Sequence, residues 1–328
     1  SDFRNTRKLF ERADQLRRKY CGDEVHLRGI IDFSNYCEND CLCCGLRKSN
    51  DIIDRYRMTP DEIIETAKTI SNVGIRSIIL ISGQDSTFDA DKISYIIYFI
   101  KHSCDIEITL SLGERDFEEY KTWRYAGADR YLLKHETSND DVYSAIHLNK
   151  KLSDRISHLK FLKSIGYEVG SGNLIGLPGQ SIEDVADDLL LCKELNVDIA
   201  SFSPFIPSPN TPYRNKNVGS VEQTLKTIAV ARLILKSTPI PATTAIATVD
   251  PLGREKALRV GANVVMPDFT PRQFRDKYCV YPNKRLLVDD PINSGSYIEH
   301  IMSTLGRRIA SYNSDLKDSS RPPQMKFH

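Results

Sequence analysis

The sequence predicts an α/β fold, a single (β/α)8 TIM-type barrel, and three observations point to it. Short β-rich runs alternate with helical patterns along nearly the whole chain, which favours a parallel sheet. Eight such runs fit within the 328 residues, and eight strands close a barrel. No Pro-, Gly- or Ser-rich linker divides the chain into separate domains. The predicted strands are Val25–Phe33, Arg76–Ser82, Ile106–Leu112, Arg130–His135, Glu168–Ile175, Ile199–Phe205, Pro241–Ile246 and Asn263–Met266.

The helices between these strands have recognisable start and stop signals. Thr59-Pro60-Asp61-Glu62 is a capping box with proline at the first helical position. Gly74 stands where a C-terminal cap of the same helix is expected. Ser181 begins another helix, with Val185 and Leu189 on its inner face. An open doubly wound sheet shows the same alternation and remains the alternative architecture.

Three segments are expected around this barrel: an N-terminal helical segment at 1–24, the barrel at 25–310 and a short C-terminal tail at 311–328. The apolar runs are too short to span a bilayer, and the first residues lack a signal-peptide pattern, so we expect no membrane association. The 45 basic and 44 acidic residues nearly cancel, which argues against a nucleic-acid-binding surface.

Cysteines gather in one short stretch, at Cys37, Cys41, Cys43 and Cys44. Adjacent cysteines in a chain this long suit a disulfide framework poorly, so we expect a reduced, cytoplasmic protein with a soft-metal site. Cys37, Cys41 and Cys44 have the spacing CxxxCxxC just after the predicted strand that ends at Phe33. Catalytic groups of a barrel lie at this end of its strands. Iron–sulfur clusters usually take four thiolates, so three would leave one iron open, as in a catalytic site.

Other interpretations of these cysteines stay open. A structural zinc site would need a nearby imidazole, and His26 falls within a predicted strand. A closed electron-transfer cluster would need Cys43 as its fourth ligand. Buried inert thiols would explain one or two cysteines but not this spacing.

The spacing CxxxCxxC after the first strand resembles the signature of the radical S-adenosylmethionine (SAM) superfamily. Further stretches resemble one family in it, the FeFe-hydrogenase maturase HydE, with biotin synthase and 3-methylornithine synthase as looser relatives. The resemblance implies one 4Fe–4S cluster whose open iron chelates SAM, and cleavage of SAM to methionine and a 5′-deoxyadenosyl radical. The similar stretches are Tyr36–Lys48, Arg55–Pro60, Thr109–Glu114, Gly127–Thr137, Gly176–Gln180, Pro204–Pro207, Pro241–Ala245 and Gly261–Pro267.

The resemblance also implies which residues contact SAM. Arg155 would bind the SAM carboxylate, because a guanidinium fork matches a carboxylate and keeps its charge. A solvated helix charge is the alternative for Arg155. Backbone carbonyls at Ser82-Gly83 and the Glu136 carboxylate would accept from SAM, and Met266 would pack against adenine. The full set of implied cofactor-binding positions is Ser82, Gly83, Ser111, Glu136, Arg155 and Met266.

On the substrate side, the resemblance implies an anion-friendly cavity lined by Arg130, Thr243, Thr244 and Tyr281. The implied substrate is an iron–cysteinate complex with carbonyl and cyanide ligands, whose sulfur the adenosyl radical attacks. Threonine hydroxyls can donate to such ligands, and arginine offsets negative charge. The alternatives are an interior ion pair between Arg130 and Glu136 and ordinary strand packing of the two threonines.

Some positions depart from the maturase pattern. Isoleucine occupies positions 199 and 246, where methionine is expected on the cavity wall, which leaves a different substrate open. A radical mutase of the 3-methylornithine synthase type is therefore the second hypothesis, and a non-catalytic iron–sulfur or zinc protein the third. No cysteine follows Cys279, so we expect a single cluster. The implied partners are an electron donor such as a ferredoxin or flavodoxin and other hydrogenase maturases in an anaerobic organism.

Overall fold

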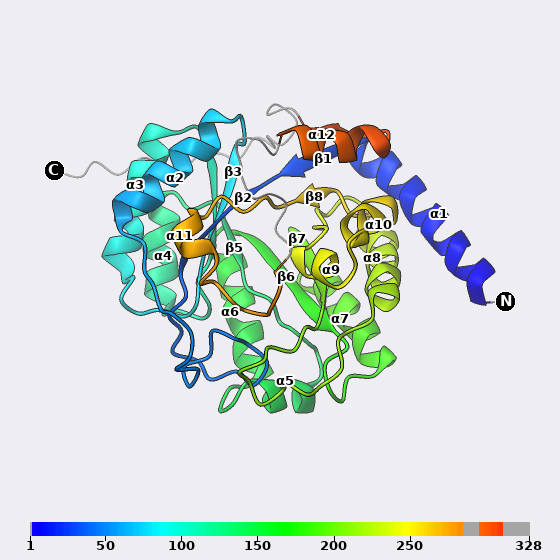
Figure 1. Cartoon of the computed structure of the whole chain (residues 1–328), viewed down its shortest axis with the longest axis horizontal. Coiled ribbons are helices and arrows are strands. Elements are labelled where there is room, and N and C mark those ends of the chain that lie inside the picture. Colours follow the sequence, from blue (N-terminus) through cyan, green and yellow to red (C-terminus); the bar gives the residue numbers. More distant parts are fainter. Residues whose placement is uncertain (1, 285–294, 311–328) are drawn as a thin grey trace.

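A computed structural model describes residues 2–284 and 295–310, so the predicted tail at 311–328 lies outside the described residues. A ring of strands is surrounded by helices, and α1 projects from one side (Figure 1). The strands are β1 (Glu24–Leu27), β2 (Gly29–Ser34), β3 (Ser77–Ser82), β4 (Glu107–Ser111), β5 (Arg130–Leu132), β6 (Glu168–Ile175), β7 (Ile199–Pro204), β8 (Val264–Val265) and β9 (Arg308–Ile309). The helices are α1 (Asp2–Cys21), α2 (Pro60–Asn72), α3 (Ala90–Ser103), α4 (Phe117–Ala126), α5 (Asp140–Ile146), α6 (Leu152–Ser164), α7 (Ile182–Glu194), α8 (Val221–Leu235), α9 (Thr244–Val249), α10 (Gly253–Arg259), α11 (Arg272–Arg275) and α12 (Gly295–Thr304).

The strands run parallel and follow one another in sequence order around the barrel. β2 to β7 form a six-stranded sheet in that order, and β8, β1 and β9 form a second sheet in the order β8-β1-β9. Parallel bridges join Ile30 to Asp268 and Pro241 to Val264. A doubly wound sheet reverses its strand order, whereas this order is sequential and is closed by bridges. The structure therefore confirms the TIM-type barrel.

The predicted strand Val25–Phe33 is in fact two strands with different partners. β1 pairs with β8 and β9, whereas β2 pairs with β3. At their junction Gly29 packs directly on α2, since a Cβ there would lie 2.8 Å from a methyl group of Ile70. The divergence lets β1 bind the short strand β9, which the sequence pattern did not predict.

The prediction of a strand at Pro241–Ile246 is wrong. Pro241 bridges to Val264, but the chain is helical from Thr244 onward. Thr243 caps this helix, because its side chain accepts from the Ile246 N–H. Proline has no N–H with which to extend a ladder, and the alanines that follow favour a helix.

The predicted helix signals are confirmed. Thr59 and Glu62 form a capping box at the start of α2, and Ser181 forms one with Asp184 at the start of α7. Gly74 follows α2 with a left-handed φ of 86°. Both helices turn their apolar faces to the barrel. Each follows a parallel strand, so the loop that precedes it lies at the carboxyl end of the barrel.

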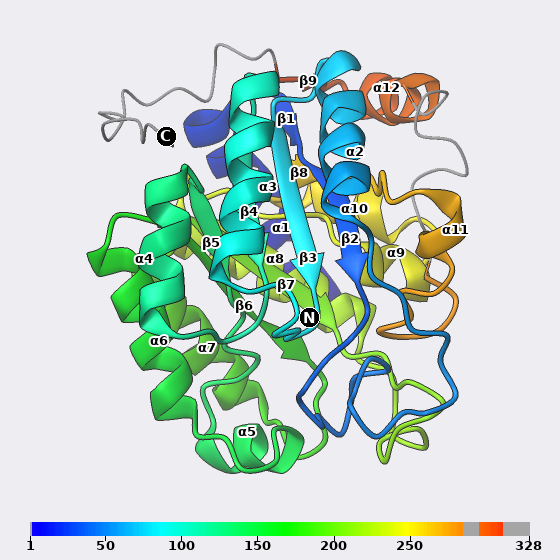
Figure 2. The same cartoon turned by 90° about the vertical axis from the view of Figure 1, so that its left-hand side faces the viewer.

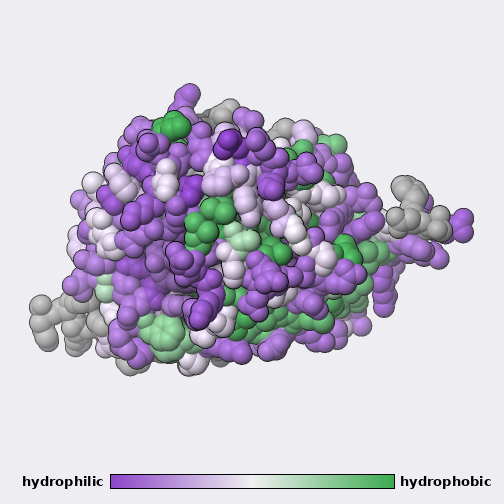
Figure 3. All heavy atoms as spheres, turned by 90° about the horizontal axis from the view of Figure 1, so that it is seen from below, coloured by the Kyte–Doolittle hydropathy of each residue, from purple (hydrophilic) through white to green (hydrophobic). Residues whose placement is uncertain are grey.

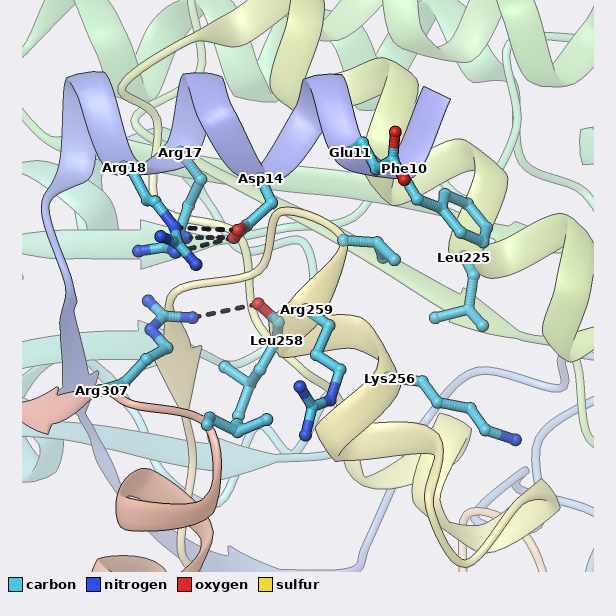
Figure 4. A pocket seen from close by; sticks show the side chains of 12 residues that line it. Phe10, Glu11, Asp14, Arg17, Arg18, Leu225, Lys256, Leu258, Arg259 and Arg307 are labelled. Atoms are coloured by element: carbon cyan, nitrogen blue, oxygen red, sulfur yellow. Dashed lines mark hydrogen bonds and ion pairs between the residues drawn. The ribbon is translucent and has the colours of Figure 1, made fainter. Parts of the chain in front are cut away.

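Two buried arginines lie where α1 meets the amino-terminal end of the barrel. Arg17 pairs with Asp14 at 2.7 Å, and Arg307 donates to backbone carbonyls near α10 and β1. These groups lie at one end of a cavity of about 430 Å³, with Phe10 and Leu225 at the other end (Figure 4). Burial and the charge of Arg17 lower the pKa of Arg307 to about 9. This cavity lies at the opposite end of the barrel from the cysteine loop.

The molecular surface is mixed in polarity. Seen from below, it is mostly hydrophilic, with hydrophobic side chains in separate patches (Figure 3). Ile52, in the cysteine loop, and Ile182 are among the exposed hydrophobic residues. Among the described residues, no helix combines the length and the apolar character needed to cross a membrane.

A Gly172→Ala substitution tests the pairing of β6 with β7. Gly172 has a φ of 150°, and an added Cβ would lie 2.6 and 2.8 Å from the backbone carbon and nitrogen of Ser201. Because both groups belong to the sheet, neither can give way easily. We expect urea denaturation to show a loss of roughly 3 kcal/mol or more in the free energy of unfolding.

Gly74→Ala is the matched control, since Gly74 also has a positive φ of 86° but no described atom within 4 Å of an added Cβ. It should lose only about 1 kcal/mol, the cost of the left-handed backbone. Equal losses for the two variants would contradict this account of the sheet.

Candidate active site

The cysteines lie in a loop that leaves the barrel after β2 and returns to it at α2. The two ends of the loop are joined, because the Asn35 N–H donates to the Tyr56 carbonyl at 3.3 Å and Ser34 forms an antiparallel bridge with Arg57. Figure 2 shows this blue loop beside α5, at the end to which the arrows of β2 and β3 point. The signature cysteines thus lie at the carboxyl end of the strands, as predicted.

One arginine organises the interior of this loop. Arg55 Nη1 donates to the carbonyls of Asn35 and Leu46 at 2.5 and 2.9 Å. Its Nη2 donates to those of Arg47 and Asn50 at 2.7 and 3.0 Å. Charge-assisted hydrogen bonds are stronger than neutral ones, so four of them hold this irregular backbone in one shape.

The segment that follows α11 supports the loop from the other side. The Asn35 side-chain amide, which is fully buried, donates to the Lys277 carbonyl at 2.9 Å. The Gly45 N–H donates to the Val280 carbonyl at 2.8 Å. The loop after the first barrel strands is therefore held by residues that follow the last barrel strand.

A second arginine links the cysteine loop to the turn after β3. Arg57 forms a bidentate pair with Asp85, at 2.7 and 3.0 Å. Its guanidinium also lies over the ring of Tyr36, 3.5 Å from the centroid. The Ser34 hydroxyl donates to the same carboxylate at 2.6 Å. Tyr36, which precedes the first signature cysteine, is thereby fixed against its neighbours.

The three signature thiols are half-buried, and Cys37 is close enough to affect the ionisation of Cys41 and Cys44. Burial and the neighbouring Cys37 raise the pKa of Cys41 to about 12, and burial also raises the pKa of Cys44. Such thiols keep their protons until a metal displaces them. Within the described part of the chain, no three His, Cys, Asp or Glu side chains converge as the ligands of a single ion would.

Cys43 faces a different environment from the signature cysteines. Cys37 and Cys44 pack against the main core, whereas Cys43 packs against a small cluster that includes Ile146 and Phe205. This position favours a packing role for Cys43 over the role of a fourth cluster ligand.

Ser82 and Gly83, at the end of β3, lie against the first signature cysteine. A Cβ on Gly83 would come within 2.7 Å of the Cβ of Cys37, so glycine allows the two backbones to approach. The Gly83 N–H donates to the Ser34 carbonyl at 3.3 Å, and the Ser82 hydroxyl donates to the Gly83 carbonyl at 2.6 Å.

Glu136 and Arg155 meet beside Cys41, whose pKa both influence. Glu136 has a φ of 67°, an uncommon value for a residue with a side chain, and its carboxylate lies 3.1 Å from Lys134 Nζ. Arg155 is buried and pairs with Glu114 at 2.5 Å, so it is not a solvated helix charge. The geometry thus brings a buried cation, Arg155, to the cysteine loop, together with a carboxylate carried by a strained backbone, that of Glu136.

Comparison with known proteins agrees with this arrangement. Residues 31–192 match the sequence model of the radical SAM superfamily. The chain is also 46% identical, over 92% of its length and 86% of the other protein, to the FeFe-hydrogenase maturase subunit HydE of Thermotoga maritima. The chain belongs to the radical SAM superfamily.

The chain is also 31% identical to 3-methylornithine synthase of Methanosarcina acetivorans, over 79% and 73% of the two chains. The crystal structure of methylornithine synthase (PylB) superposes with a TM-score of 0.80 at 26% identity, covering 93% of this chain and 89% of that one.

Radical SAM enzymes bind a 4Fe–4S cluster and SAM, and the residues present fit both. Cys37, Cys41 and Cys44 would hold the cluster, because their thiols are free and share one loop at the carboxyl end of the strands. Because Gly83 has no side chain, its backbone lies directly beside Cys37, where SAM would bind. Binding would release the thiol protons and leave the Cys41 thiolate near the charge of Arg155.

Two further predicted SAM positions fall at strand ends of this radical SAM barrel. Ser111 is the last residue of β4, opposite Ile81 in β3. Met266 directly follows β8 and is half-buried. Both residues lie at the carboxyl end of the barrel, on the same side as the cysteine loop. Their contact with SAM is a proposal.

The prediction that Arg130 binds substrate is corrected by its position. Arg130 begins β5, at the amino-terminal end of the barrel, and its guanidinium pairs with Glu107 at 2.6 Å and Glu168 at 2.5 Å. These carboxylates begin β4 and β6, so the group ties three strand starts together. It does not pair with Glu136, which lies at the other end of the same strand region. The site residues lie at the carboxyl ends of the strands, so a residue that begins a strand lies too far from them to bind the same substrate.

The other substrate positions lie at the carboxyl end of this enzyme's barrel. Thr243 and Thr244 begin α9, as cap and first residue, instead of lying in a strand. Tyr281 is half-buried and hydrogen-bonds Thr248 of the same helix, and desolvation raises its pKa to about 12. These positions are compatible with a cavity over the barrel.

Sequence reasoning missed several charged residues of the site. Lys150 Nζ lies 2.5 Å from the Glu114 carboxylate that also binds Arg155. Lys284 Nζ pairs at 2.7 Å with Asp32, an almost fully buried residue of β2. Glu114 ends a stretch already similar to the maturase, so its place after β4 could have identified it. Lys284 lies far along the chain from Asp32, and no local pattern links them.

A Glu114→Gln substitution tests the ion pairs beneath Arg155. Burial alone would raise the pKa of Glu114 from 4.5, but Arg155 and Lys150 outweigh it and lower the pKa to about 2. Since the folded pKa is below the unfolded one, this stabilisation is present above pH 4.5 and is lost as the pH falls toward 2. Urea denaturation at pH 7 should show the variant less stable by ~3 kcal/mol.

The difference between the two proteins should shrink at pH 3.5, about one unit below the unfolded pKa. Glu118→Gln is the control, since the Glu118 side chain is 76% exposed and pairs only at the surface with Lys121. It should change stability by less than ~0.5 kcal/mol. A Glu114 effect that is the same at both pH values would contradict the assigned ion pairs.

Proposed function

We propose that this chain is a HydE-type radical SAM maturase that helps to assemble the di-iron subcluster of FeFe-hydrogenase. The observation that carries the proposal is the 46% identity to HydE of Thermotoga maritima over most of both chains. The identity to 3-methylornithine synthase is lower, at 31%.

The residues of the site divide into cluster-holding and SAM-binding groups. When bound, the cluster supplies the electron that cleaves SAM to methionine and a 5′-deoxyadenosyl radical. Arg155 binds the SAM carboxylate, while Glu114 and the Lys134 carbonyl hold that guanidinium in place. Glu136 accepts from the SAM ribose or amino group. Ser82, Gly83, Ser111 and Met266 complete this side of the site.

The substrate would lie over the barrel, next to SAM. Thr243, Thr244 and Tyr281 donate hydrogen bonds to its polar ligands, and Lys284 contributes positive charge near Tyr281. An iron–cysteinate complex with carbonyl and cyanide ligands fits such donors, and its sulfur is the atom that the adenosyl radical attacks.

The partners follow from this chemistry. A one-electron donor of the ferredoxin or flavodoxin class reduces the cluster, and other hydrogenase maturases receive the product. The protein would work in the cytoplasm of an anaerobic organism, where reduced clusters survive. A mutase of the 3-methylornithine synthase type is the alternative, favoured by the TM-score of 0.80 to methylornithine synthase.

Cysteine variants test the cluster assignment. After anaerobic reconstitution with iron and sulfide, reduction and addition of SAM, the wild type should form 5′-deoxyadenosine. Cys41→Ala should lose at least ~99% of this activity, because one iron loses its protein ligand. Cys43→Ala is the matched control and should keep most of it, since Cys43 packs against an apolar cluster. Absence of product in the wild type, or equal losses in both variants, would refute the proposal.

A maturation assay separates the two candidate reactions. The wild-type protein is added to a hydrogenase maturation system that lacks its HydE component, and hydrogenase activity is measured. We expect activity to be restored, and Cys41→Ala to restore none. Good SAM cleavage without restored hydrogenase activity would move the assignment to the mutase.

A further inference from the structure

A histidine outside the signature touches one of the cluster cysteines. His147 Nδ1 lies 3.1 Å from the Sγ of Cys41. The residue follows α5 directly, and its own N–H closes that helix by donating to the Tyr143 carbonyl at 2.9 Å. The imidazole therefore reaches the cysteine loop from a separate element of the barrel, more than 100 residues along the chain.

The contact is fixed by the backbone as well as by the side chains. The N–H of Leu42, next to Cys41, donates to the carbonyl of Ile146, next to His147, at 2.9 Å. The imidazole ring is 92% buried, since its relative exposure is 8%, and its centroid lies 4.6 Å from that of the Tyr143 ring. The backbone bond holds the two segments together, and the neighbouring Tyr143 ring limits the positions open to the His147 imidazole.

The direction of the hydrogen bond follows from the chemistry of a cluster ligand. A cysteine bound to iron is a thiolate and has no proton to donate. The proton between the two atoms must then belong to Nδ1 of His147. Among the described residues, Nε2 has no hydrogen-bond partner, so nothing there favours the opposite tautomer.

We infer that His147 is a positioning residue that donates its Nδ1–H to the Cys41 thiolate and thereby raises the reduction potential of the cluster. The inference rests on the proposed function only in requiring the cluster. A hydrogen bond to a ligating sulfur stabilises the added negative charge of the reduced state. The neighbouring charges of Arg155, Lys150 and Glu136 act on the same sulfur but do not contact it through a hydrogen bond.

Three substitutions of His147 test this hydrogen bond in the reconstituted full-length protein. His147→Leu removes the donor. His147→Asn places an amide N–H near the position of Nδ1, whereas the longer His147→Gln places it near that of Nε2. Iron content and thermal unfolding report on cluster loading and on folding. The potential is measured by redox titration, followed by electron paramagnetic resonance, without SAM or substrate.

We expect His147→Leu and His147→Gln to shift the reduction equilibrium against the reduced cluster by roughly tenfold, about 59 mV for one electron. His147→Asn should stay within about threefold of the wild type at the same iron content. Wild-type potentials in the Leu or Gln variants would overturn the inference, as would an Asn variant that shifts as far as they do. If Leu does not load iron, the Asn and Gln pair decides between these outcomes.

The potential is independent of what the enzyme acts on. A protein that cleaves SAM but fails to mature hydrogenase would refute the maturase assignment. The shifts in potential expected for the His147 variants would still hold. A failure of the His147 variants to shift, with maturation intact, would refute the hydrogen bond alone.

Discussion

The site depends on the way in which Arg55 closes the cysteine loop. The 25 residues of irregular backbone at 35–59 connect β2 to α2, and such a segment has a large conformational entropy to lose. Four carbonyls turn inward to one guanidinium, which can serve them all because its donors lie in a rigid plane. Cys37, Cys41 and Cys44 are then presented from one preformed loop.

The barrel brings the partners of this loop to the same place. Gly83 follows β3, Glu114 follows β4 and Glu136 follows β5, so each strand end contributes a group to the carboxyl face. His147, which follows α5, and Arg155, in α6, add their side chains to the same face. The charges are mutually paired, and burying them costs less free energy because Glu114 binds Arg155 and Lys150 together.

Local patterns predicted what local forces determine. The capping boxes of α2 and α7 depend on residues near one another in the chain, and the structure confirms them. The cysteine spacing is also local, whereas the role of the three cysteines as cluster ligands stays a prediction. The β-branched residues Thr243, Thr244 and Ile246 favour a strand in this segment, but the cap at Thr243 starts a helix instead. Arg130 was misplaced because its partners, Glu107 and Glu168, belong to other strands. The contact of His147 with Cys41 is likewise a product of the fold, and the sequence carries no local signal for it.

The iron content of an Arg55→Met variant tests the central claim most directly. After anaerobic reconstitution, the variant should keep the circular dichroism of the wild type but bind less than about a tenth of its iron, because the loop no longer holds the thiolates together. Arg124→Met, which removes an arginine that also donates to two carbonyls but lies away from the loop, should load iron normally. A folded Arg55→Met protein with a full, SAM-responsive cluster would contradict the account.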